Sequence, residues 1–304
     1  MPNTPTSARD SRRGFLLGVL GVVIFAMTLP MTRLAVGDAS DPQLPPAFVT
    51  AGRAGLAGLL SLLYLGAVRA PRPPQRLLPA LGVSALGSVI GFPLFLALAL
   101  RHVDAMHAAV ITGVLPLGTA MVAALVLRQR PSNGFWFFAV LGCALVLAFA
   151  AWSGGGTLSA ADGLLLLSVA SASIAYVAGA RAALVMPAQQ VICWVLVLSL
   201  PLTLPALLWL WPAAPVRWSA WLGFAYVSLF SMWLGFFAWY RGLALGGVMR
   251  VSQVQLLQPF LALLFAVPVL GEPLKPLTLL FALAVMAVVF FGRKMPTARP
   301  GRPA

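Results

Sequence analysis

Apolar stretches long enough to cross a lipid bilayer follow one another almost without interruption from Gly14 to Gly292. About 20 mainly apolar residues are enough to span the hydrocarbon layer as a helix. Because lipid offers no hydrogen-bond partners, the backbone of each stretch must satisfy its own amide and carbonyl groups, which requires helices. The sequence therefore predicts an all-α, polytopic membrane protein.

Ten spans can be drawn, and proline- or glycine-rich turns separate most of them. The second span is the weakest, because it contains Arg53, the one strongly charged residue well within a span. The predicted spans cover residues 14–37, 45–68, 77–100, 105–127, 133–152, 160–180, 188–211, 218–240, 248–270 and 274–292.

The 20 Lys and Arg residues outnumber the six Asp and Glu residues, a balance that would favour a nucleic-acid partner in a soluble protein. Here the chain is 61% hydrophobic and the charges are scattered over short loops. With a cytoplasmic N-terminus, 15 basic residues lie inside, and the other five are Arg53 and the outer residues Arg33, Arg101, Arg217 and Lys275. This positive-inside distribution predicts that both termini are cytoplasmic and that nucleic acid is not a partner.

The two halves of the chain share a pattern. Residues 97–100 precede a short loop and a span with a central proline, Pro116, and residues 242–245 precede the same arrangement around Pro259, 143 positions later. An odd number of spans in each half would place the second half upside down, which is the inverted-repeat plan of many secondary transporters, built around a central cavity. The expected segments are a cytoplasmic N-terminal segment at 1–13, five-helix repeats at 14–152 and 160–292, an external linker at 153–159 and a basic cytoplasmic tail at 293–304.

Three stretches carry a resemblance to a known family: TLPMTRLAV at 28–36, residues 99–117, and residues 241–260 with the Gly271-Glu272 that ends that span. They are similar to bacterial EamA-type transporters of the drug/metabolite transporter (DMT) superfamily, in particular to amino-acid and metabolite exporters. One departure is that the Gly-Glu expected after the fourth span reads Arg128-Gln129. The resemblance implies a cavity lined mainly by spans 1, 3, 4, 6, 8 and 9, export of amino acids or similar metabolites, and a bacterial inner (plasma) membrane location.

The ninth span contains the most informative polar residues. Ser252, Gln255 and Gln258 recur every third residue and so share one helical face with Pro259. Amides are costly against lipid, so this face should either line a cavity or hydrogen-bond to neighbouring helices, and both interpretations stay open. The 143-residue offset pairs Gln255 with Thr112 in the first half.

The expected substrate pathway collects polar and aromatic residues that lie within the spans. Tyr176 and Trp233 are deep enough to stack on an apolar part of a substrate, or else to pack against lipid and protein. The predicted pathway residues are Thr28, Ser88, Thr112, Tyr176, Ser231, Trp233, Ser252, Gln255 and Gln258.

Prolines inside spans remove a backbone hydrogen bond and can act as hinges, although a static kink is the commoner role. The repeat-related Pro116 and Pro259 are the preferred hinge candidates. Arg53 is expected to reach an outer carboxylate, Asp38 or Asp41, in preference to binding a carboxylate of the substrate.

Two further patterns concern the packing of the helices. Trp239 and Tyr240 end the eighth span on its inner side, and we expect them to join an aromatic belt at the membrane surface. Small-residue pairs predict close contacts between helices, and these pairs are Gly14 with Gly18 and Gly87 with Gly91.

No Asp or Glu lies in the middle of a span, and the only histidines, His102 and His107, lie by the outer loop between the third and fourth spans. A proton-coupled carrier usually has an intramembrane carboxylate or histidine relay. We therefore expect facilitative uniport by alternating access, which exports amino acids, neutral and aromatic ones included, or similar small metabolites.

The alternatives are a proton-coupled exporter of drugs, nucleosides or sugars, a channel or sensor, and a membrane-embedded enzyme, which is the least favoured. An enzyme would need clustered titratable residues, a metal-ligand spacing or a nucleotide-binding motif, and the sequence is poor in all three. The expected partners are a small solute and the lipid bilayer, with no cofactor and no metal, and the expected assembly is a monomer.

Cysteine labelling of intact cells tests the topology. In a chain whose Cys143 and Cys193 are replaced by serine, Ser132→Cys should be shielded from an impermeant external reagent, because the loop after the fourth span faces the cytoplasm. Gly155→Cys should react, because the linker between the halves faces outward. The reverse labelling pattern would refute this orientation.

Overall fold

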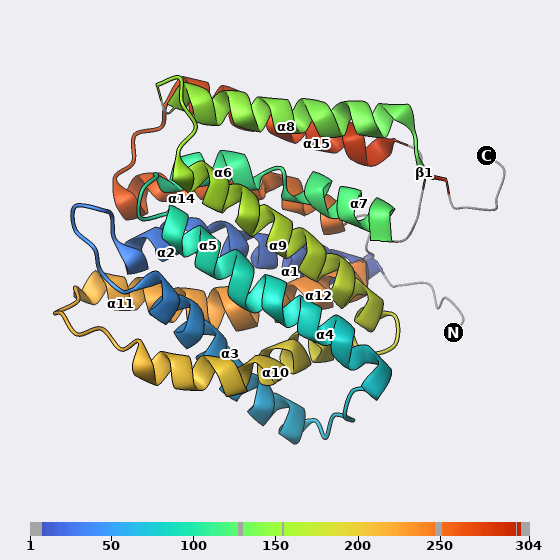
Figure 1. Cartoon of the computed structure of the whole chain (residues 1–304). Helices are drawn as coiled ribbons and strands as arrows, with labels where there is room; N and C mark the ends of the chain where they lie inside the picture. The colour runs from blue at the N-terminus through green and yellow to red at the C-terminus, as the bar shows by residue number, and fades with distance from the viewer. Residues whose placement is uncertain (1–7, 127–129, 154, 247–250, 296, 299–304) are drawn as a thin grey trace.

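The computed structural model describes residues 8–126, 130–153, 155–246, 251–295 and 297–298. The helices form one bundle, and the beginning of α1 (Ala8–Ala26) and the end of α15 (Pro276–Lys294) lie at the same, right-hand end of it in Figure 1. α1 thus begins inside the segment 1–13 that was predicted to precede the first span. The Arg128-Gln129 pair and parts of both predicted terminal segments lie outside the described residues.

Several helices of the first half are interrupted. In chain order they are α1, α2 (Thr28–Val36), α3 (Pro46–Ala67), the 3₁₀ segment η1 (Gln75–Leu77), α4 (Leu78–Ser84), the π-helical segment η2 (Ala85–Gly91), α5 (Phe92–Ala99), α6 (Ala105–Thr112), α7 (Leu115–Val126) and α8 (Asn133–Ser153).

The second half repeats this succession in part, because its first helix is continuous where α1 and α2 are separate. Its members are α9 (Ala160–Ala183), α10 (Ala188–Trp209), α11 (Trp218–Ala225), the π-helical segment η3 (Tyr226–Leu234), α12 (Gly235–Gly246), the 3₁₀ segment η4 (Ser252–Leu257), α14 (Gln258–Leu270) and α15. The all-α prediction lacked one small element, the antiparallel pairing of the two-residue strands β1 (Arg130–Pro131) and β2 (Thr297–Ala298).

The structure agrees with a polytopic membrane protein. Within the described residues, eight helices are long and apolar enough to cross a membrane, and two shorter apolar helices, Val254–Leu270 and Pro276–Gly292, follow them. The shorter pair coincides with the predicted ninth and tenth spans. The prediction of an α-helical, multi-pass protein is therefore confirmed, and the count of ten crossings is part of the proposal made below.

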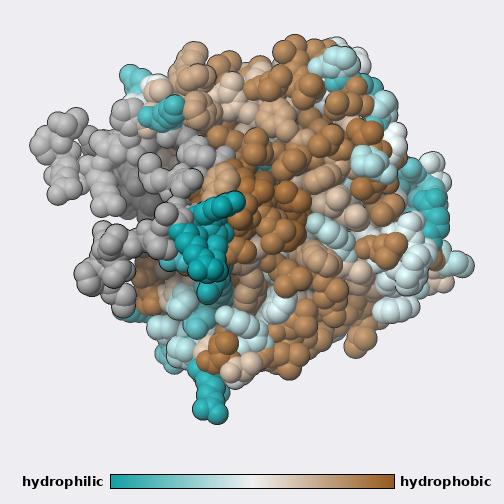
Figure 2. Space-filling model, turned by 180° about the vertical axis from the view of Figure 1, so that it is seen from behind, coloured by the Kyte–Doolittle hydropathy of each residue, from teal (hydrophilic) through white to brown (hydrophobic). Residues whose placement is uncertain are grey.

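Apolar side chains on the outside of the bundle mark the surface that faces lipid. Leu63, Leu208 and Trp209 are 70%, 76% and 89% exposed. Figure 2 shows hydrophobic residues over the middle of one face of the molecule, with hydrophilic residues at its right-hand edge and on its left-hand side. A soluble protein rarely exposes an apolar surface of this extent, whereas lipid covers it without cost.

Irregular turns occur at matching positions of the two halves. The π segment η2 ends at Gly91, and η3 ends at Leu234, 143 positions later. α6 gives way to α7 just before Pro116, and η4 gives way to α14 just before Pro259. Proline is tolerated in the first turn of a helix, where its missing N–H needs no partner, so each proline marks the start of a new helix. The offset read from the sequence thus recurs in the local structure.

Both predicted glycine pairs lie at close helix contacts. A Cβ added to Gly242 on α12 would lie 2.7 Å from the backbone nitrogen of Gly18 and 3.0 Å from the carbonyl oxygen of Gly14 on α1. Gly87 and Gly91 both face Ser171 on α9, and a Cβ at Gly91 would lie 2.9 Å from its hydroxyl oxygen. The prediction of close contacts at these glycines is confirmed.

The glycine contact between α1 and α12 should be sensitive to a single methyl group. Gly242→Ala should lower the melting temperature in detergent, because the new Cβ meets backbone atoms that cannot rotate away, at a cost of about 1–3 kcal/mol. Gly82→Ala is the matched control, since a Cβ added there would meet no atom within 4 Å, and the gain in helix propensity should leave the protein equally or more stable. Equal melting curves for the two variants would contradict the packing described here.

Candidate functional site

A cavity of about 260 Å³ lies between helices of both halves. Its walls belong to predicted spans 1, 3, 4, 6, 8 and 9, and span 2 contributes Arg53. The lining residues are Phe25, Thr28, Leu29, Arg53, Ser88, Phe92, Leu96, Thr112, Leu115, Tyr176, Ser231, Met232, Phe236, Trp239, Tyr240, Gln255 and Gln258.

Seven of the nine predicted pathway residues line this one cavity, and they are Thr28, Ser88, Thr112, Tyr176, Ser231, Gln255 and Gln258. Ser252 begins η4, but its side chain is outside the part of the chain that is described. The structure places Trp233 outside this cavity, with its ring 4.8 Å from that of Phe237. Trp233 follows Ser231 by two residues, which is about half a helical turn, so the two side chains cannot point the same way.

Three polar side chains form a buried chain across the interface between the halves. Thr28 Oγ1 lies 2.8 Å from Ser231 Oγ, and Arg53 Nη2 donates to Ser231 Oγ at 3.2 Å. The exposed fraction is 7% for Thr28, 3% for Ser231 and 3% for Arg53. Ser231 of the second half therefore holds together two helices of the first half, α2 and α3.

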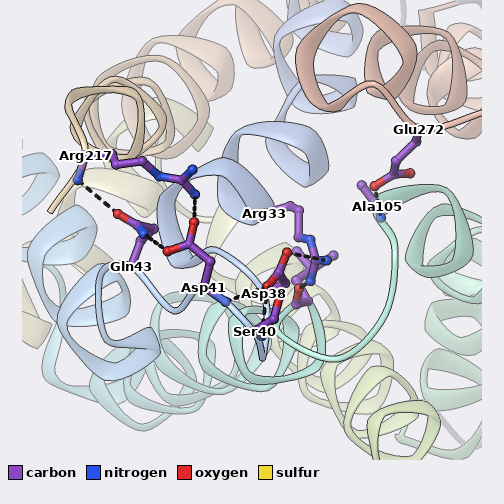
Figure 3. Close-up of polar contacts among 9 residues, drawn as sticks. Arg33, Asp38, Ser40, Asp41, Gln43, Ala105, Arg217 and Glu272 are labelled. Carbon is purple, nitrogen blue, oxygen red and sulfur yellow. Dashed lines mark hydrogen bonds and ion pairs between the residues drawn. The ribbon is translucent and has the colours of Figure 1, made fainter.

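Arg53 does not reach the outer carboxylates, contrary to the prediction. Asp38 forms an ion pair with Arg33 at 3.8 Å, and Asp41 forms one with Arg217 (Figure 3). Each aspartate thus has a closer cation on its own side of the protein, and Arg53 stays within the cavity. The sequence signal for this was present, since Arg53 is a charge within a span and no acidic residue lies in the middle of any span.

The amides of the ninth span face the broken fourth span. A second, small cavity of about 50 Å³ is lined by Gln255, Gln258 and Thr112 together with the two hinge candidates, Pro116 and Pro259. Gln255 belongs to the 3₁₀ helix η4, and Gln258 follows it three residues later as the first residue of α14. A 3₁₀ turn brings every third residue into line, which agrees with both side chains lining this cavity. The structure therefore brings the two helix breaks and the predicted amides together.

Aromatic rings supply much of the apolar wall. The rings of Phe25 and Phe236 meet edge to face at 5.0 Å, and those of Phe236 and Tyr240 stack at 6.0 Å. Trp239 is 9% exposed and lines the cavity together with Tyr240. The aromatic belt predicted for Trp239 and Tyr240 is therefore wrong, because this turn of α12 faces α1 and the cavity instead of the lipid surface.

Polar contacts also join the halves at the end of the bundle predicted to face outward, on the left in Figure 1. The carboxylate of Glu272 accepts the backbone N–H groups of Ala105 and Met106 at 2.7 and 2.9 Å and so caps the start of α6 (Figure 3). His107 Nε2 lies 2.6 Å from Asp162 Oδ1. Burial raises the pKa of Glu272, and the two N–H groups, which favour its charged form, oppose that effect only in part.

Known proteins resemble the chain along most of its length. The EamA-like transporter family matches residues 12–151 and again residues 159–292. The uncharacterized transporter YdeK of Bacillus subtilis (strain 168) is 44% identical over 286 residues, which cover 92% of this chain and 97% of the relative. A solved crystal structure with no function in its description aligns with a TM-score of 0.62 over 92% of this chain and 96% of its own, and at 18% identity it shows a shared fold alone.

The bridging role of Ser231 can be tested by thermal unfolding. Ser231→Ala should destabilise the protein by about 1–3 kcal/mol, because it leaves Arg53 and Thr28 buried without their shared partner. Ser228→Ala is the matched control, since this buried serine lies in the same π segment and donates only to the carbonyl of Phe224, one turn earlier. If Ser228→Ala lowers the melting temperature as much as Ser231→Ala, the bridge does not stabilise the fold.

Proposed function

Since the chain belongs to the EamA-like transporter family of the drug/metabolite transporter superfamily and is thus a membrane transporter, we propose that it exports amino acids, neutral and aromatic ones included, or similar small metabolites. The family and the name of the relative point to transport rather than to enzyme catalysis. The proposed location is the bacterial plasma membrane, with both termini cytoplasmic, and the bacterial source of the relative supports the first part.

The proposed class of solute rests on the residues that line the central cavity. Hydroxyls, two amides and one guanidinium stand beside aromatic and aliphatic side chains, and none of the described lining residues is acidic. A volume of about 260 Å³ is that of roughly nine water molecules in the liquid, at about 30 Å³ each, and drug-sized ligands occupy about 300–1,000 Å³. The cavity therefore suits a small amphipathic solute better than a large drug.

The proposed architecture is ten helices in two inverted five-helix repeats, in a protein that acts as a monomer. The matched π segments and the matched proline breaks, each pair 143 positions apart, support the repeat. Cavity residues obey the same offset, since Ser88 pairs with Ser231 and Thr112 with Gln255. Related halves that enclose one site are the arrangement on which rocking carriers depend.

Alternating access requires that contacts between the halves break and re-form. On the side proposed to face outward these contacts include the cap of α6 by Glu272, the pair of His107 with Asp162 and the ion pair of Asp41 with Arg217, each between one half and the other. Pro116 and Pro259, which lie against one small cavity, are the proposed flex points for the movement. In the conformation described, these contacts of the proposed outer gate are formed.

We assign no coupling ion to this cycle. The described lining of the central cavity contains no carboxylate and no histidine, and His107 is engaged with Asp162 in the outer contact. Facilitative movement down the gradient of the solute is the simplest mechanism that these residues support. A proton-coupled exporter of drugs, nucleosides or sugars is the alternative that the next experiment can detect.

Counterflow in liposomes tests the proposed function. Purified protein should accelerate uptake of labelled leucine or phenylalanine into vesicles loaded with the same unlabelled amino acid, and an imposed pH or Na⁺ gradient should not drive accumulation. Gln255→Leu and Gln258→Leu should slow this flux about tenfold or more, and Gln75→Leu, an exposed residue of η1, should not.

Three results would contradict parts of this proposal. No flux of any of some twenty amino acids would refute the solute class. Uphill accumulation in a proton gradient, lost on replacement of His102 or His107, would refute uncoupled transport. Undiminished flux in both glutamine variants would show that these amides serve helix packing alone.

A further inference from the structure

Arg53 is a buried cation with unused hydrogen-bond donors. It lies on α3, is 3% exposed and lines the central cavity. Its Nη2 atom donates to Ser231 Oγ, whereas its Nε and Nη1 atoms have no partner. A guanidinium stays protonated in proteins and offers five N–H donors in a fixed plane. Most of this donor set is therefore free to bind something in the cavity.

No side chain of the protein neutralises this charge in the described structure. The lining contains no Asp or Glu among the residues described. The carboxylates of the outer loops are engaged elsewhere, Asp38 and Asp41 with arginines, Asp162 with His107 and Glu272 with backbone N–H groups. A charge within a membrane span costs at least about 3 kcal/mol unless it is paired, and such residues usually mark solute or ion pathways.

We propose that Arg53 is the binding group for a carboxylate of the transported solute, an inference that rests on the proposed function and narrows its substrate class to carboxylic acids. The planar guanidinium matches a carboxylate through two parallel N–H···O bonds. Each of its two forks still has a nitrogen without a partner, Nε in one and Nη1 in the other, and Nη2, which belongs to both, has a second N–H besides the one that it donates to Ser231. Ser231 holds the guanidinium at Nη2 and so fixes its orientation.

The rest of the cavity then selects what the carboxylate is attached to. Aromatic rings of Phe25, Phe92 and Phe236 offer an apolar wall, and Gln255 and Gln258 offer amide oxygens that can accept from an ammonium group. An α-amino acid with an apolar side chain satisfies all three parts of the cavity. The cation itself has no counterpart in the second half, since the position 143 residues later is Leu196, so the carboxylate binds on the first-half side only.

A series of analogues in the unmodified protein tests this without any mutation. In the leucine counterflow, external phenylalanine and 3-phenylpropionate should compete, because both carry the carboxylate. Phenethylamine and phenylalaninol lack it and should compete about 10- to 100-fold more weakly. Competition of similar strength by all four compounds would overturn the proposal.

Variants of Arg53 test whether this residue causes the preference for carboxylates. Arg53→Gln should abolish the preference for carboxylates and Arg53→Lys should keep part of it, because Lys retains the charge but not the planar fork. Arg72→Gln, an exposed arginine of the inner loop, is the matched control and should behave as the unmodified protein. A carboxylate preference that survives in Arg53→Gln would overturn the assignment.

A binding measurement separates failure of this proposal from failure of the proposed function. Addition of 3-phenylpropionate should raise the melting temperature of the purified protein and phenethylamine should not, and Ser231→Ala, which releases Nη2 of Arg53, should reduce that shift. If no compound is transported but this selective shift is present, the transport proposal fails and the carboxylate site stands. If amino acids are exchanged but the shift is absent or unselective, the carboxylate site fails alone.

Discussion

The hydrocarbon of a membrane offers no partner to a backbone amide or carbonyl, and the irregular turns of this protein are placed accordingly. Among the described residues, the π segments carry Ser88 and Ser231, the first break of the fourth span follows Thr112, and the 3₁₀ segment carries Gln255. All four side chains line the central cavity. Two of them donate to a backbone carbonyl one turn earlier, Ser88 to Ser84 and Thr112 to Ala108. The irregular turns thus lie where polar side chains surround a cavity, which is also what a polar solute needs.

Hydropathy was enough to predict most of the helices. Seven residues of the cavity were predicted from the polar and aromatic residues within the spans, the 143-residue offset and the resemblance to EamA-type transporters, because all of these can be read along the chain. The rotation of each helix about its axis is set by its neighbours and was harder to predict. Trp233 was assigned to the cavity although it lies half a turn from Ser231, whereas Trp239 and Tyr240 were assigned to the lipid surface although α12 turns them inward. A π segment shifts the phase of every later residue in its helix, so a constant 3.6-residue period fails beyond it.

Arg53 was misplaced for a different reason. Its distance from the outer carboxylates along the chain permitted a contact, and only the three-dimensional arrangement shows that Arg33 and Arg217 already bind those groups. A comparison of charges along the sequence pairs each charged residue with the nearest residue of opposite charge. In a chain with 20 basic and six acidic residues, however, most basic residues must find another partner. For basic residues in loops this partner is water or lipid headgroups, and for Arg53 it is the hydroxyl of Ser231 and, in our proposal, a carboxylate ligand.

The position of Ser231 connects the proposed solute binding with the proposed movement of the halves. Its hydroxyl, from the second half, meets Thr28 and Arg53 of the first half, so the guanidinium lies at the interface that the proposed alternating access must rearrange. A ligand can shift a conformational equilibrium only as far as it binds the two states differently. With the proposed carboxylate bound, the charge of Arg53 is neutralised in both states, whereas the empty cavity must carry an uncompensated cation through the closed state between them. The loaded carrier therefore crosses that state more easily than the empty one, which favours exchange of one carboxylate solute for another over return of an empty site.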